Sequence, residues 1–165
     1  MNKNVSKEKE LYKPMQQWLG IYLRDKYPKC MIMTLDTSEV TLDSVLEKQG
    51  VIDQYPQAVG LNIQIDVLGL ATGKNGTKLA FIEAKKEPLN LHHLGQLWAY
   101  CKLIDPDEAF LLSSRGMGSL DKILKNLGRT DLLDFGSEDE NKKIHVGSWD
   151  IIRKCPDMKT MVPRI

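Results

Sequence analysis

Two carboxylates and a lysine interrupt apolar runs in the middle of this 165-residue chain. Asp66 lies inside the apolar run of residues 63–68, and Glu83 and Lys85 follow a second apolar run. Both runs predict strands, and the glycine-containing segment 71–77 between them predicts a hairpin. Because side chains alternate along a strand, Glu83 and Lys85 share one face. Two carboxylates and an ammonium group at one sheet edge would suit a cation site with an attached activating group.

A structural interpretation of the same hairpin stands beside the chemical one. Charged side chains at strand ends commonly pair in solvent, and such pairs contribute little to stability. Burial of Asp66 near Glu83 separates the two interpretations, because a solvated pair has no reason to leave water.

The periodicity of the remaining chain predicts the elements that position these residues. Apolar residues recur at helical spacing in several segments and form compact runs in others. We expect helices over residues 5–27, 41–49, 89–104 and 120–127, and strands over residues 30–35, 109–112 and 144–152. This order predicts an α/β fold with a mixed central sheet flanked by helices.

The first expected helix carries an apolar stripe and an acidic start. Pro14 has no backbone donor and suits a first helical turn, so the regular helix should begin close to Glu10. A solvated carboxylate at a helix start is favoured by the helix dipole alone, which is the structural interpretation of Glu10. The core stripe consists of Leu11, Met15, Trp18, Leu19 and Tyr22.

The helix expected over residues 89–104 has two distinct stripes. Its core face is predicted to consist of Leu94, Leu97, Trp98, Cys101 and Ile104. His92, Gln96 and Tyr100 follow at i, i+4 and i+8 and form a polar stripe beside it. Exposed helix faces usually carry Glu and Lys, so this composition indicates a role beyond solvation, although a polar helix margin is the structural alternative.

Composition limits the classes of protein that remain. The length suits one domain over residues 1–165. No apolar run approaches a membrane span, and the charged N-terminal segment does not resemble a secretory signal, so we expect a cytoplasmic protein. Cys30, Cys101 and Cys155 form no CxxC pair, which argues against a zinc ribbon or a four-cysteine cluster. A formal net charge of +1 neither predicts nor excludes a nucleic-acid partner.

These residues, in this order, resemble the PD-(D/E)xK nuclease superfamily, which has the restriction-endonuclease-like fold. Glu83-Ala84-Lys85 matches the E-x-K element of that family, and Asp66 matches its upstream acid. Gln96 and Tyr100 are similar to the Q-x-x-x-Y helix motif of the RecB-like branch, and Glu10 is similar to the acid that many members carry on their first helix. The resemblance implies an αβββαβ core over about residues 10–127, with residues 128–165 as an extension. No proline precedes Asp66, and the four cysteines of the iron–sulfur branch are absent.

The resemblance implies a metal-dependent deoxyribonuclease with Mg²⁺, for which Mn²⁺ substitutes. Asp66, Glu83, the Ala84 carbonyl and Glu10 would provide oxygen ligands, which hard cations prefer. Lys85 would orient the attacking water or stabilise charge on the phosphorus centre, and Gln96 and Tyr100 would support the site or contact the DNA backbone. Candidate phosphate contacts are Lys74, Lys78, Lys86, Lys102 and Arg115.

Three alternatives remain open from the sequence. Within the family, a junction-resolving or repair endonuclease fits a chain too short for a separate recognition domain, and a homodimer or a partner protein would then help to select the DNA. A non-catalytic DNA-binding or complex-forming module could use the same fold. An unrelated α/β domain with Asp66 and Glu83 at its surface is the third.

Overall fold

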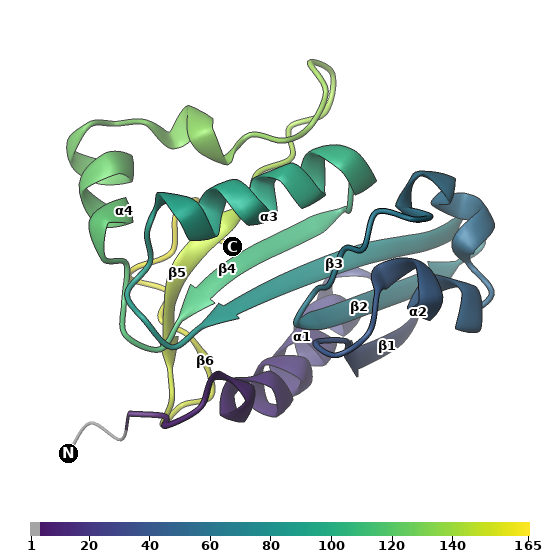
Figure 1. Ribbon diagram of the computed structural model, residues 1–165, viewed down its shortest axis with the longest axis horizontal. Coiled ribbons are helices and arrows are strands. Elements are labelled where there is room, and N and C mark those ends of the chain that lie inside the picture. The colour runs from purple at the N-terminus through teal and green to yellow at the C-terminus, as the bar shows by residue number, and fades with distance from the viewer. Residues whose placement is uncertain (1–3) are drawn as a thin grey trace.

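A mixed six-stranded sheet forms the centre of the computed structural model, which describes residues 4–165 (Figure 1). Its strands follow one another across the sheet in chain order. The first three are antiparallel, β4 and β5 continue parallel to β3, and β6 returns antiparallel to β5. The strands are β1 (Met31–Asp36), β2 (Val67–Gly73), β3 (Gly76–Lys85), β4 (Glu108–Ser113), β5 (His145–Asp150) and β6 (Cys155–Pro156). The expected α/β class with a mixed sheet is therefore confirmed.

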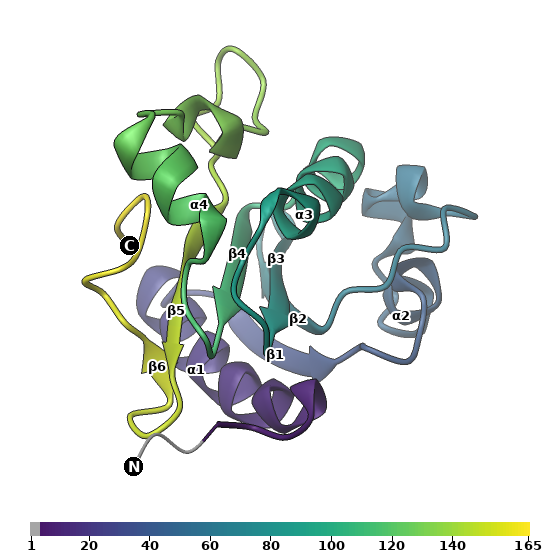
Figure 2. The ribbon, with the colours of Figure 1, turned by 60° about the vertical axis from the view of Figure 1, so that its left-hand side comes forward.

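Helices cover both faces of the curled sheet (Figure 2). On one face, the 3-10 turn η1 (Glu8–Leu11) leads into α1 (Tyr12–Lys26), and Pro14 lies in the first turn of α1 as expected. On the other face lie α2 (Leu42–Lys48) and α3 (Leu91–Ile104). Shorter turns complete the chain: η2 (Ile52–Gln54), η3 (Pro56–Ala58), α4 (Ser119–Asp121), the π-helical turn Lys122–Asn126 and η5 (Thr130–Leu133).

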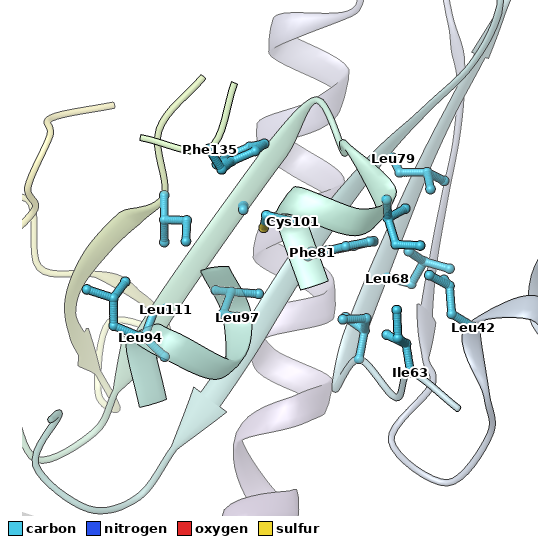
Figure 3. Close-up of a cluster of buried hydrophobic side chains, with 14 of the residues drawn as sticks. Leu42, Ile63, Leu68, Leu79, Phe81, Leu94, Leu97, Cys101, Leu111 and Phe135 are labelled. Carbon is cyan, nitrogen blue, oxygen red and sulfur yellow. The ribbon is translucent and has the colours of Figure 1, made fainter. Parts of the chain in front are cut away.

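Alternation along the strands divides the interior into two cores. On the α1 side, β3 contributes Ala80, Ile82 and Ala84. On the α3 side it contributes Leu79 and Phe81, which pack with Leu97 and Cys101 of α3 (Figure 3). Strand β4 is buried on both faces, as its uninterrupted apolar run predicts. Residues 128–165, expected as an extension of the core, provide β5 and β6 of the same sheet.

The strand expected over residues 63–68 begins only at Val67, so it does not contain Asp66. Ile63 and Ile65 are buried, but they precede β2 and belong to a loop. Their backbone carbonyls are satisfied by the neighbouring loop, because Leu42 N donates to Ile63 O at 2.7 Å and the Thr37 hydroxyl donates to Ile65 O. Tertiary hydrogen bonds thus replace a strand ladder at residues 63–65, and Asp66 immediately precedes the first paired residue.

Two further expectations are corrected. The hairpin is shorter than residues 71–77, because β2 runs to Gly73 and β3 resumes at Gly76 after a two-residue turn. Trp98 is 36% exposed rather than part of the sheet-facing core. Its indole Nε1 donates to Asp134 O at 2.8 Å, so the ring covers the segment after η5. Among residues 4–165, no helix is both long enough and apolar enough to cross a membrane.

Candidate active site

Asp66 and Glu83 lie across from each other at the start of β2 and the end of β3. Val67 pairs with Ile82 in the antiparallel ladder, so the next position along the same register places Asp66 opposite Glu83. Val67 and Ile82 both face the α1 core, so alternation along β3 directs Glu83 toward the α3 side. The register therefore brings together the two acids that the sequence singles out.

Backbone and side-chain contacts hold this pair beside Lys85. The Ala84 N–H donates to Asp66 Oδ2 at 2.9 Å, which attaches the carboxylate to the strand that carries Glu83. Lys85 Nζ lies 3.8 Å from Glu83 Oε1, with 16% of its side chain exposed. The E-x-K spacing therefore places an acid and its lysine on one face at the end of a strand.

Glu83 is in an unfavourable environment for a carboxylate. It is only 6% exposed, and its Oε2 has no hydrogen-bond partner among the described residues. Burial, and after it the negative charge of Asp66, raises the pKa of Glu83 to about 9. Lys85 opposes this rise without cancelling it. A buried carboxylate with a free oxygen is costly unless a ligand completes its coordination.

A third carboxylate comes from η1, and it is Glu8. The Lys86 N–H donates to Glu8 Oε2 at 3.3 Å, and Tyr12 Oη lies 3.5 Å from Glu8 Oε1. Burial raises the pKa of Glu8, with Lys85 opposing and Asp66 adding to the shift. The same two carboxylates, after burial, raise the pKa of Tyr12, so its hydroxyl remains a neutral donor between them.

Glu10 lies elsewhere, which corrects its expected position at the rim of the site. Its carboxylate accepts backbone N–H groups from Ser6 at 2.8 Å and Lys7 at 3.0 Å. These bonds lower the pKa of the exposed Glu10 carboxyl and cap the turn η1. Glu8 precedes the regular helix α1 by a full turn. The helical pattern in the sequence therefore gave no reason to choose Glu8 rather than Glu10 as the acid near the site.

The polar stripe of α3 that the sequence singled out lies mostly in solvent. His92 and Gln96 are exposed, and Gln96 Nε2 donates to the half-buried Tyr100 hydroxyl at 3.2 Å. The histidine that Lys85 influences is His93. Burial is the main cause that lowers the pKa of His93, and the positive charge of Lys85 lowers it further. Its position was available from the sequence, because His93 continues the buried stripe of Leu97 and Cys101 by one helical turn.

The candidate phosphate contacts separate into two groups. Lys86 follows Lys85 directly, and the exposed Arg115 lies just beyond Ser114, whose N–H donates to Lys85 O at 3.0 Å. Lys74 and Lys78 lie at the opposite, hairpin end and line a cavity of about 450 Å³ there. Lys78 and Glu83 are five positions apart on β3, a distance of about 17 Å.

Other contacts already engage two of these lysines. Lys78 Nζ lies 3.7 Å from Asp107 Oδ1 and 5.6 Å from the centre of the Tyr27 ring. Lys102 Nζ lies 5.6 Å from the centre of the Trp98 ring, in the second half of α3. The hairpin lysines and Lys102 are therefore not positioned beside the acidic pair.

A cation at this site would depend on few protein ligands. Among residues 4–165, no group of three or more His, Cys, Asp or Glu side chains is arranged to hold a metal ion. Magnesium, however, is commonly held by one or two carboxylates together with water and substrate phosphates. Asp66 and Glu83 suit that mode, because they form a close pair with one unused buried oxygen.

The chain was also compared with known proteins. No family model, no curated protein and no solved structure matches it.

Proposed function

We propose that this protein is a metal-dependent deoxyribonuclease with a restriction-endonuclease-like core. The observation that carries the proposal is the pairing of the buried Glu83 with the half-buried Asp66, which lies opposite it in the β2–β3 register, with Lys85 beside them. Solvated strand-end charges would not show this burial, so the structural interpretation of the hairpin is disfavoured. The order α1, β1, β2, β3, α3, β4, with β4 parallel to β3, supports the same assignment.

Asp66 and Glu83 would hold a divalent cation, Mg²⁺ or Mn²⁺. The unpartnered Glu83 Oε2 and the mutual repulsion of the two carboxyl groups both favour a positively charged ligand. When bound, such a cation supplies Lewis acidity toward a phosphoryl oxygen and lowers the pKa of a coordinated water. The hydrogen bond from the Ala84 N–H would keep the Asp66 carboxylate oriented toward the cation.

Lys85 would act on the substrate directly. Its ammonium group has three donors on a side chain that is partly exposed, so it can reach a phosphate group while staying beside Glu83. It would orient the attacking water or stabilise the negative charge that develops on the phosphate oxygens. Glu8 and Tyr12, on the other side of Asp66, would orient this carboxylate rather than meet the substrate.

The proposal is tested by incubating the purified protein with linear, circular and branched DNA. We expect cleavage with Mg²⁺ or Mn²⁺ and none with EDTA; cutting of circular DNA would identify an endonuclease. Lys85→Ala should reduce the rate by roughly 10²–10⁴-fold, the range typical of a lost proton-transfer or charge-stabilising group. Lys78→Ala is the matched control, because it removes the same charge on the same strand at a position about 17 Å from Glu83.

One result would contradict the assignment, and another would contradict only the role of Lys85. Wild-type protein that cuts no DNA in either metal, but binds it equally with and without metal, would favour the non-catalytic module. Cleavage that is unchanged in Lys85→Ala but lost with EDTA would keep the nuclease and refute the role given to this lysine.

A further inference from the structure

The sheet-facing stripe of α3 is apolar at Leu97 and Cys101 and becomes polar at His93. The facing side of β3 changes in the same way, from Phe81 to Glu83. Leu97 and Cys101 face the sheet, are completely buried, and pack in the core that contains Phe81 of β3 (Figure 3). On β3, the positions that follow Phe81 on this face are Glu83 and Lys85. On α3, which runs back along the sheet, the position that precedes Leu97 on the same stripe is His93.

The contacts of His93 determine which ring nitrogen carries its proton. Asn90 caps α3: its side chain accepts the His93 N–H at 3.1 Å, and its own backbone N–H donates to His93 Nδ1 at 3.3 Å. Because Nδ1 accepts a hydrogen bond, the ring is neutral and its proton is on Nε2. In the described part of the chain, Nε2 has no hydrogen-bond partner and is free to donate to a ligand.

The charges around His93 come from three residues. Lys85 at the end of β3 and His92 on the same helix favour the neutral ring, and Glu87 in the connecting loop opposes them. A neutral Nε2–H donor can approach the Lys85 ammonium without charge repulsion. Lys85 and His93 thus bring donor groups from two different elements to the same end of the sheet.

We propose that His93 is a substrate-binding residue, whose Nε2–H donates to a non-bridging phosphate oxygen of the DNA strand held beside Lys85. This inference rests on the proposed nuclease function. Hydrogen bonds to a charged group are stronger than neutral ones, so His93→Ala should weaken substrate binding by about 10-fold to 100-fold. The variant should show mainly a higher KM, because the hydrogen bond is made equally in the bound substrate and in the transition state.

The test measures kcat, KM and DNA affinity for four variants. His93→Ala removes the donor and also the capping contact, and His93→Gln restores an N–H near the Nε2 position. Asn90→Ala removes the side-chain cap but leaves the imidazole and the backbone N–H that fixes its tautomer. His92→Ala is the matched control, since it removes the adjacent, exposed imidazole.

We expect KM and the Kd for DNA to rise in His93→Ala, to recover partly in His93→Gln, and to stay near wild type in the other two variants. If His93→Ala behaves like His92→Ala, or if Asn90→Ala raises KM as much as His93→Ala does, the inference is overturned while the nuclease stands. If the wild type binds DNA without cutting it, the affinities alone decide the role of His93. If the wild type neither binds nor cuts DNA, both proposals are overturned.

Discussion

The Ala84 N–H donates to Asp66 Oδ2 at 2.9 Å, so one acid of the site is attached to the strand that carries the other. Strand pairing alone would bring the two residues near each other, but this bond also fixes the orientation of the Asp66 carboxylate. The cost is electrostatic, since Asp66 is held next to the buried Glu83. Because Asp66 and Glu83 are held together against their mutual repulsion, we expect the stability of the protein to depend on their charges, on bound metal and on pH.

Removal of the Glu83 charge should stabilise the metal-free protein at high pH. The pKa of Glu83 is raised from 4.5 to about 9, so between these values the unfolded chain has lost the proton that the folded chain keeps. Stability of the wild type therefore falls as pH rises through this window, whereas Glu83→Gln has no proton to lose. We expect the melting temperature of Glu83→Gln to exceed that of the wild type by more at pH 8 than at pH 5.

Thermal melting in EDTA measures this difference. A gain of 1 kcal/mol corresponds to about 2–4 °C for a chain of this size. Glu87→Gln, which changes an exposed carboxyl four positions along the chain, is the control and should show no such pH dependence. An equal gap between wild type and Glu83→Gln at both pH values would show that Glu83 is ionised normally.

Glu8 and Glu10 should differ sharply in their effect on cleavage. Glu8 contacts Lys86 N and lies among the charges of the site, so Glu8→Gln should reduce activity by about 10–100-fold, as for other groups that orient metal ligands. Glu10→Gln should leave cleavage unchanged and slightly lower the melting temperature, because Glu10 caps η1. Initial rates with saturating Mg²⁺ decide between them. If Glu10→Gln loses activity and Glu8→Gln does not, Glu10 would be the acid that the family resemblance implies.

Basic residues near the site should contribute to DNA affinity, and those at the hairpin should not. Lys86→Ala and Arg115→Ala should each weaken binding to all sequences and reduce the salt slope of the affinity by about 1. Lys74→Ala and Lys78→Ala remove the same charge at the far end of β2 and β3 and serve as controls. Binding titrations at several salt concentrations test this. A larger loss in the hairpin variants would place the DNA along the sheet rather than at its acidic end.

Two glycines should respond oppositely to alanine. A Cβ at Gly69 of β2 would lie 2.6 Å from Leu23 Cδ1 and 2.9 Å from Leu19 Cδ2, both in the α1 core, so Gly69→Ala should destabilise the fold by about 1–3 kcal/mol. A Cβ at Gly95 of α3 meets nothing within 4 Å, and Gly95→Ala should stabilise by about 0.5–1 kcal/mol. Chemical denaturation measures both changes. A stable Gly69→Ala variant would mean that the two leucines move aside at little cost.

Periodicity places the stripes of α3 but does not decide the surroundings of each stripe. His92, Gln96 and Tyr100 share a stripe, but periodicity cannot tell which of two adjacent stripes faces a site. Trp98 has core-like chemistry and sits next to the true core positions, yet its indole contacts Asp134 O at the margin of the helix. In the structure Leu97 and Cys101 are completely buried, and His93 continues their stripe toward the N-terminus of α3.

Short-range sequence patterns were sufficient to predict several features of this fold. Alternation predicts that Glu83 and Lys85 share a face, the apolar run of β4 predicts burial on both sides, and Pro14 predicts the start of α1. These features depend only on neighbouring residues and on the periods of strands and helices.

Tertiary structure alone decided which acid of the N-terminal segment meets the site and where the basic residues lie. Glu8 reaches Lys86 N, and Glu10 turns back to Ser6, because η1 approaches the end of β3 from the other face of the sheet. Lys78 and Lys85 are close in sequence, but a strand extends the chain by about 3.3 Å per residue and so carries them to opposite ends of the sheet. Such relations join segments that are far apart in the chain, and no short-range period specifies them.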